Sequence, residues 1–184
     1  MNLIDILFLV LLVAGLALGF FQGTIKFAIA IIAFYVGIVL ASLYFQSVGN
    51  FFRQKFNSSA EVGQITAFAT MLAVSFLLLT IAGLYTFRYF KMPTSLDFFD
   101  KIIGTLLGLV MSALLLGILA VLLKDLFVYR NPASSASLPV IISFQANVRG
   151  STLVRFFGDN ILPLIYSSVR PMLPREADLI FRVR

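Results

Sequence analysis

Four long apolar runs dominate the chain, at residues 3–21, 27–45, 65–87 and 102–123. A helix needs about 20 apolar residues to cross a hydrocarbon core about 30 Å thick. Within these runs the only charged side chain is Asp5, near the start of the first. The first run is too long for an ordinary signal-peptide core and no basic residue precedes it, so we expect it to be retained. The pattern predicts an all-α polytopic membrane protein with a bundle of four transmembrane helices.

The connections between the runs differ in length. Only residues 22–26 separate the first two runs, which predicts a tight antiparallel helical hairpin. The longer connection at 46–64 contains SVGNFFRQKF, whose phenylalanines recur at helical spacing. This pattern is typical of a short helix in the headgroup plane, although an ordinary loop remains the alternative. Ser58 followed by Glu61 is a capping-box pattern that predicts the start of the third helix.

From Lys124 onward the composition changes, which divides the chain into a transmembrane domain at 1–124 and a tail at 125–184. RNPASSASLP, at 130–139, is typical of a linker. The segment 151–169 carries its apolar residues on one helical face, and we expect Pro163 to kink or end that helix. The tail is therefore predicted to be amphipathic, helical and membrane-peripheral. It could lie on the membrane, pack against the bundle or bind a partner.

Composition supports a membrane protein and excludes several chemistries. Of 184 residues, 60% are hydrophobic and 12% are charged, whereas about 25% are charged in soluble domains. The chain has no Cys and no His, which excludes disulfides, Cys/His zinc sites and imidazole catalysis. The net charge of +6 is best explained by anionic lipid headgroups near the Arg and Lys residues of the tail. Nucleic acid is not expected as a partner, because no recognised reading motif is visible.

Basic residues near the ends of the four runs do not decide the orientation. Four lie on each side, so the positive-inside rule gives no answer. The arginines of the tail would favour a cytoplasmic tail, but the rule discounts residues so far from a span.

Two stripes of small residues recur at intervals of four, one in the first run and one in the fourth. In lipid, helices associate through close backbone contact, which small residues permit. We therefore expect the stripes to be packing surfaces that meet each other or a second copy of the chain. The alternative is that they line a pathway or form a hinge between states. The helix-packing candidates are Gly15, Gly19, Gly23, Gly104, Gly108 and Ser112.

Two segments carry a resemblance to a known family. The resemblance is to the colicin V production protein (CvpA) family, which has two hallmarks. The first is an early Asp followed by a Gly-aromatic turn out of the first helix, and it resembles NLIDILFLVLLVAGLALGFFQG. The second is Asp-basic-x-x-Gly-x-x-x-Gly at the start of the last span, and it resembles DKIIGTLLGLVMSALLLG. The matching residues other than the glycines are Asp5, Phe20, Asp100 and Lys101. Gln22 stands where the family usually has a basic residue, and Met111 where it often has Arg. These departures put a charge pairing between the exit turn and the fourth helix in doubt for this chain.

The resemblance implies a multi-pass protein of the bacterial inner membrane. Its expected role is accessory to toxin production or export of the colicin V type, or to envelope homeostasis, with an unidentified secretion or envelope partner and assembly into a homo-oligomer through the glycine stripes. The alternative is a subunit of a small oligomeric channel or transporter. An enzyme is not expected, because none of the eight acidic residues pairs with another inside a span, and no cofactor or metal is implied. For Asp5 and Asp100 the simplest role is capping of helices at the interface.

Overall fold

The computed structural model describes residues 2–56, 59–89, 96–129 and 139–172, and these residues form helices and turns without a strand. The all-α prediction is confirmed. Three helices are long and apolar enough to cross a membrane, at Leu3–Lys55, Val62–Thr86 and Asp97–Val128. The elements are α1 (Leu3–Phe56), α2 (Ala60–Thr86), α3 (Asp97–Leu123), the π-helix η2 (Lys124–Tyr129), α4 (Pro139–Gly150), α5 (Thr152–Phe156), the π-helix η4 (Phe157–Ile161), α6 (Leu162–Val169) and the 3-10 turn η5 (Arg170–Met172).

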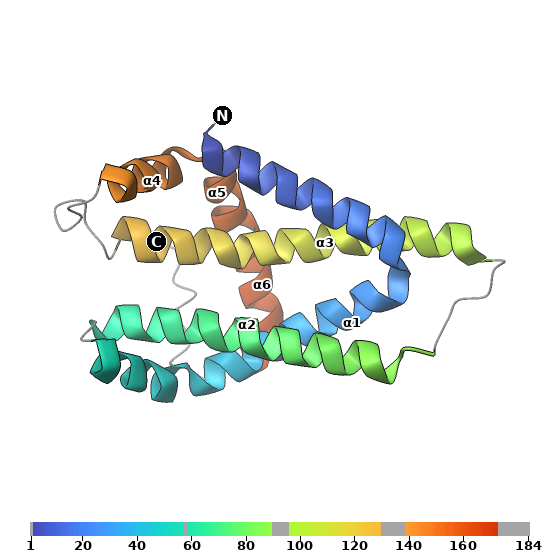
Figure 1. Cartoon of the computed structure of the whole chain (residues 1–184), viewed down its shortest axis with the longest axis horizontal. Helices are drawn as coiled ribbons and strands as arrows, with labels where there is room; N and C mark the ends of the chain where they lie inside the picture. Colours follow the sequence, from blue (N-terminus) through green and yellow to red (C-terminus); the bar gives the residue numbers. More distant parts are fainter. Residues whose placement is uncertain (1, 57–58, 90–95, 130–138, 173–184) are drawn as a thin grey trace.

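The first two predicted spans lie in one element, α1, which bends sharply at Gly23. This glycine has φ 78° and ψ 178°, a backbone conformation that residues other than glycine rarely adopt. We call residues 3–22 the first arm and residues 24–56 the second arm. Figure 1 shows the two arms diverging from the bend, with α3 between them and α2 beside the second arm. The predicted tight hairpin is therefore an open V with a single-residue corner.

The predicted break after residue 45 is wrong, because α1 continues without interruption to Phe56. Neither the separate in-plane helix nor the loop is present in residues 46–56. Gly49, which looks like a helix breaker, instead allows α2 to approach: a Cβ at this position would lie 3.0 Å from Cα of Gln64. The start of α2 is capped by Ser59, whose Oγ accepts the N–H of Val62 at 3.4 Å. Ser58, the predicted cap, lies outside the described residues.

Helix α3 is shared by two apolar cores. One core joins the second arm, α2, α3 and α6, and includes the fully buried Phe34, Phe45 and Phe68. The other joins the first arm and α3 to α4, α5 and η4, and centres on Phe8, whose ring lies 5.9 Å from that of Phe157. Each arm of the V therefore packs on its own side of the same central helix.

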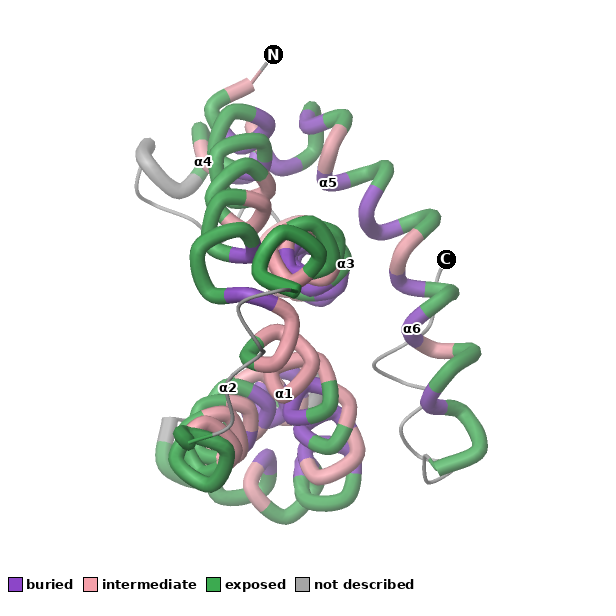
Figure 2. Tube along the Cα trace, turned by 90° about the vertical axis from the view of Figure 1, so that its right-hand side faces the viewer, coloured by how far each residue is buried: buried purple, intermediate pink, exposed green. Residues whose placement is uncertain are grey.

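The tail packs against the bundle rather than extending away from it. Helices α5 and α6 run across α3 on one side (Figure 2). Val154 and Ile165 are fully buried, and Phe157, Leu162 and Val169 are at most 5% exposed. The predicted irregularity at Pro163 is present: α5 ends at Phe156, the π-helix η4 follows at Phe157–Ile161, and Pro163 lies in the first turn of α6 directly after it.

Candidate functional site

The two predicted stripes of small residues face each other within one chain. A Cβ on Gly19 would overlap the carbonyl oxygen of Gly104, and a Cβ on Gly108 would lie 2.9 Å from Cα of Gly19. A Cβ on Gly15 would overlap the hydroxyl of Ser112. We call this contact the glycine seam; it consists of Gly15, Gly19 and Gly23 on α1 against Gly104, Gly108 and Ser112 on α3.

The seam brings two backbones together where side chains would hold them apart. The carbonyl oxygens of Gly15 and Gly19 face the α-carbons of Gly108 and Gly104, the arrangement in which Cα–H groups make weak hydrogen bonds to carbonyls between helices. Ser112 donates its hydroxyl to the Gly108 carbonyl at 2.7 Å within its own helix, so it brings no unpaired polar atom into the contact. Such close contact is a main source of helix association in lipid.

At the bend, Asp100 of α3 caps the second arm of α1. Its carboxylate accepts the backbone N–H of Thr24 at 2.8 Å, and the Thr24 hydroxyl donates to the Asp100 carbonyl at 3.0 Å. The first N–H groups of a helix lack partners inside it, and a carboxylate there also interacts favourably with the helix dipole. The carboxylate lies against Gly23, where a Cβ would overlap it. The predicted capping role of Asp100 thus serves another helix rather than its own.

Asp5 joins the start of α1 to the start of α5. Asp5 is buried, with 4% of its surface exposed. Its carboxylate accepts the Ser151 hydroxyl at 2.6 Å and the Leu153 N–H at 3.0 Å. It also accepts the N–H of Asn2 at 3.1 Å. Ser151 in turn caps α5 by accepting the Val154 N–H at 3.0 Å. One buried carboxylate therefore caps two helices and connects the tail to the N-terminus.

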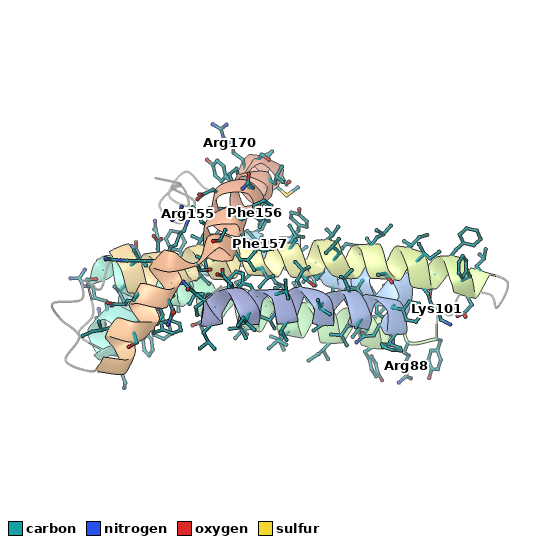
Figure 3. All side chains as sticks on the ribbon, turned by 90° about the horizontal axis from the view of Figure 1, so that it is seen from above. Arg88, Lys101, Arg155, Phe156, Phe157 and Arg170 are labelled. Carbon is teal, nitrogen blue, oxygen red and sulfur yellow. The ribbon has the colours of Figure 1, made fainter. Side chains whose placement is uncertain are left out.

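The other two family-motif residues lie at the surface near the bend. Lys101 pairs with Asp97 at 2.7 Å, and both side chains are largely exposed. Its ammonium lies 5.9 Å from the ring of Phe20. Arg88, near the same end of the bundle (Figure 3), lies over the rings of Tyr85 and Tyr89. Exposed aromatic and basic side chains of this kind are typical of the interface between hydrocarbon and headgroups.

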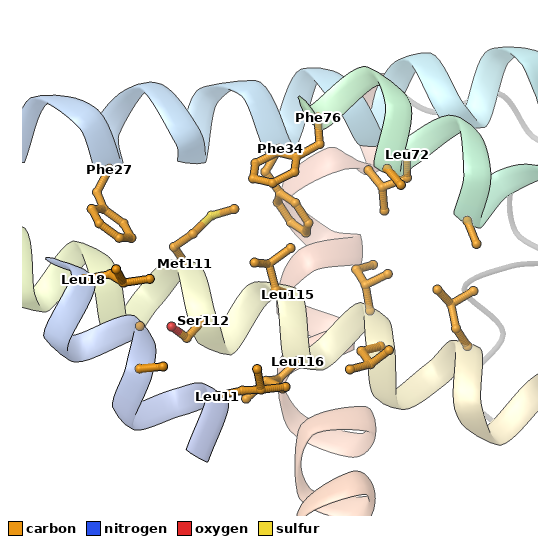
Figure 4. Close-up of a pocket in the computed structure, with 17 residues that line it drawn as sticks. Leu11, Leu18, Phe27, Phe34, Leu72, Phe76, Met111, Ser112, Leu115 and Leu116 are labelled. Carbon is orange, nitrogen blue, oxygen red and sulfur yellow. The ribbon is translucent and has the colours of Figure 1, made fainter. Parts of the chain in front are cut away.

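An apolar groove lies beside the seam, a feature that sequence reasoning missed. It has a volume of about 510 Å³ and is lined by both arms of α1, by α2 and by α3 (Figure 4). Ser112 is the one residue with a polar side chain among those that line it, and its hydroxyl is bonded as described above. By its chemistry the groove offers an ion or a polar substrate almost nothing to bind.

The tail contacts α3 through a further glycine that the stripe spacing did not include. A Cβ on Gly117 would lie 2.9 Å from Cγ2 of Ile161 and 3.3 Å from Cδ1 of Ile165. Gly117 follows Gly108 by nine residues, which at about 100° per residue places it on the opposite face of α3. A second contact is the ion pair of Lys124 and Asp159 at 3.0 Å, which connects η2 to η4. An isolated glycine and a distant ion pair leave no periodic signal in one sequence.

Comparison with models of protein families shows a match. The family model described as Colicin V production protein matches residues 4–161. No curated protein and no solved structure matches the chain. The matched segment includes the whole glycine seam, both capping carboxylates and the docked tail through η4.

Proposed function

The chain belongs to the colicin V production protein family, and from that membership we propose that it is a non-enzymatic accessory protein of the bacterial inner membrane. It supports the production or export of a colicin V-type peptide toxin, or envelope homeostasis more generally. The family is not known as a family of enzymes. The observation that carries the proposal is the family match, which extends over most of the chain and over three helices able to cross a membrane.

In this proposal each arm of α1 crosses the bilayer separately, so the chain crosses four times. The bend at Gly23 and the exposed aromatic residues near it then lie at one surface, and Asn2, Phe56 and Lys124 lie toward the other. We place this second end in the cytoplasm. Arg155 lies on the docked tail, in the half of the bundle toward this end (Figure 3), where basic side chains attract the anionic lipids of the cytoplasmic leaflet.

The glycine seam supports a structural role for the stripes within one protomer. Its small residues are covered by each other, so a second copy could reach them only if the seam opened. A homo-oligomer of this protein would therefore use other surfaces. The apolar lining of the groove within the protomer also argues against an ion pathway through a single chain. The channel or transporter alternative then requires a pathway between protomers.

Complementation tests the proposal in a bacterial strain that lacks its own family member and carries a colicin V-type toxin operon. The full-length chain should restore toxin release, measured as inhibition of a sensitive strain. The Gly19→Leu variant, which forces the seam apart, should not restore it, while Ala82→Leu on the exposed face of α2 should. Equal release with and without the chain would refute the accessory role.

Flux measurements separate the accessory role from the channel alternative. The purified chain in liposomes should give no ion flux above that of empty liposomes under an applied voltage or a salt gradient. A sustained flux that Gly19→Leu abolishes and Ala82→Leu preserves would replace the accessory role with a channel.

A further inference from the structure

We infer that helix α6 of the tail lies within the hydrocarbon of one leaflet, parallel to the membrane plane, with its outer face against acyl chains. This inference goes beyond the proposed function: it rests on the four crossings proposed above and not on the accessory role. It places α6 deeper than the membrane-peripheral position expected for the tail. The depth at which α6 crosses α3, the bonding of its polar groups and the positions of the tail's charges carry it.

Helix α6 crosses α3 inside the ends of that helix (Figures 1 and 2). The stretch of α3 between Lys101 and Lys124 is uncharged, and its length of about 34 Å is sufficient to cross a hydrocarbon core about 30 Å thick. A Cβ on Gly117 would lie 3.3 Å from Cδ1 of Ile165 in α6. Gly117 precedes Lys124 by seven residues, which is about 10 Å along the helix axis. The contact between α6 and α3 is therefore at the depth of acyl chains rather than of headgroups.

The inner face of α6 belongs to the core that the spans share. Leu162, Ile165 and Val169 are at most 3% exposed. They lie in one apolar cluster with Phe34 of the second arm and Phe68 of α2, two helices long and apolar enough to cross a membrane. Helix α6 is therefore packed against the sides of the membrane-crossing helices and does not cover their ends.

The outer face of α6 meets the requirement that lipid imposes on polar groups. Leu164 is 61% exposed on this face. The exposed hydroxyls of Ser167 and Ser168 both donate to the Leu164 carbonyl, at 2.9 Å and 2.7 Å. In lipid, such bonds to a carbonyl of the same helix take the place of bonds to water. Both serine hydroxyls of α6 therefore have partners without water.

The charges of this part of the tail lie outside α6, which has no charged residue. Before α6, Asp159 pairs with Lys124 at 3.0 Å, at the polar end of α3, and Arg155 is exposed one turn earlier. Directly after α6, Arg170 is exposed. An Arg at the end of a helix in hydrocarbon can extend its long side chain to the headgroups. The acyl chains around α6 therefore meet no charge from α6 itself.

Spin labels on single cysteines test the depth of α6, because the chain has no Cys. One label replaces Leu164 on the outer face of α6. A matched control replaces Ile142, which is 45% exposed on the tail helix α4. That helix lies at the end of the bundle (Figure 1), where the rings of Phe144 and Phe127 of η2 are 4.9 Å apart. A second control replaces Leu78, which is 63% exposed on α2.

Each full-length variant is placed in vesicles of phosphatidylcholine and phosphatidylglycerol. The collision rate of the label is measured with oxygen, which concentrates in hydrocarbon, and with a water-soluble nickel chelate. The ratio of oxygen to nickel collisions at Leu164→Cys should be at least about fivefold higher than at Ile142→Cys, because α6 lies about 10 Å inside Lys124. On a logarithmic scale it should lie closer to the ratio at Leu78→Cys.

A ratio at Leu164→Cys that lies closer to that of Ile142→Cys would overturn the inference, since α6 would then lie among headgroups or in water. If Leu78→Cys also gave the ratio of Ile142→Cys, α2 would not cross the membrane, and the inference would fall together with the four crossings. Toxin release does not enter this test, so the accessory role stands or fails independently.

Discussion

At the scale of single residues, the glycines of α1 serve different purposes that one substitution can distinguish. Gly19 lies in the seam, where an added Cβ would be 3.0 Å from the carbonyl carbon of Gly104 and from Cα of Thr105, and closer still to the Gly104 oxygen. Gly37 lies in the same helix, but its Cβ would make ordinary contacts of 3.4 Å and more with Leu72 and Phe76. The backbone of α3 therefore leaves no room for a side chain at Gly19, whereas Gly37 has room for one.

We therefore predict opposite effects for Gly19→Ala and Gly37→Ala. Gly19→Ala should lower the free energy of unfolding by about 1–3 kcal/mol, the usual cost of overpacking. Gly37→Ala should be neutral or should stabilise by up to about 1 kcal/mol, because alanine is the better helix former. Thermal unfolding of the purified variants in mild detergent measures both. If both variants lose stability equally, close approach at the seam does not explain Gly19.

The buried carboxylate of Asp5 and the exposed one of Asp159 offer a second comparison. Asp5→Asn keeps the shape but replaces a charged acceptor of three hydrogen bonds, which should lower the free energy of unfolding by about 1–3 kcal/mol. Asp159 makes one ion pair and its side chain is 50% exposed, so Asp159→Asn should cost at most about 1 kcal/mol. Chemical denaturation of both variants measures the difference, and a larger loss for Asp159→Asn would contradict the role given to Asp5.

At the scale of elements, the tail is attached to the bundle at three kinds of contact. These are the Asp5 cap on α5, the pair of Lys124 and Asp159 between two π-helical segments, and the apolar face of α6 on α3. The apolar contact carries most of the attachment, because Ile165 and its neighbours on that face are fully or almost fully buried.

Adjacent residues of α6 test this attachment. Ile165 is fully buried, whereas Leu164 is 61% exposed. Ile165→Ala should cost about 2–5 kcal/mol of packing and accelerate hydrogen exchange in residues 152–169, while Leu164→Ala should leave exchange there unchanged. If exchange in this segment is fast in the unmodified chain as well, the tail is not stably docked.

The sequence was most informative about elements whose signal is local. The apolar runs predicted helices long and apolar enough to cross a membrane, although the described residues form three such helices where four were expected. The interval of four predicted which faces of two helices carry small residues. The continuation of α1 past residue 45 could not be predicted, because Gly49 has the same sequence signature whether it ends a helix or admits Gln64 of a neighbour. The bonds of Asp5 to Ser151 and of Asp100 to Thr24 join residues 146 and 76 positions apart, and nothing in a single sequence relates them.

At the scale of the whole molecule, the proposed four crossings place the bend of α1 and the far end of its second arm on opposite sides of the membrane. Gln22 is exposed next to the bend, and Gln54 is exposed near the end of the second arm. Because the chain lacks Cys, Gln22→Cys and Gln54→Cys each introduce a unique thiol. In intact cells stripped of the outer membrane, an impermeant maleimide should label Gln22→Cys directly and Gln54→Cys only after the membrane is permeabilised. Labelling of both thiols from the same side would refute four crossings.

The central claim is that the two small-residue stripes pack against each other within one chain, and a cysteine pair across the seam tests it most directly. A Cβ at position 15 would lie 2.8 Å from Cβ of Ser112, whereas the two Cβ atoms of a disulfide lie about 3.5–4.5 Å apart. The two helices therefore need to move apart by only about 1 Å for the bond to form. Oxidation of the Gly15→Cys/Ser112→Cys double variant in membranes should give a crosslink within the monomer, seen as one linked peptide pair by mass spectrometry. Each single variant should stay monomeric on a non-reducing gel. Dimers from either single variant, or no crosslink in the double variant, would contradict the account.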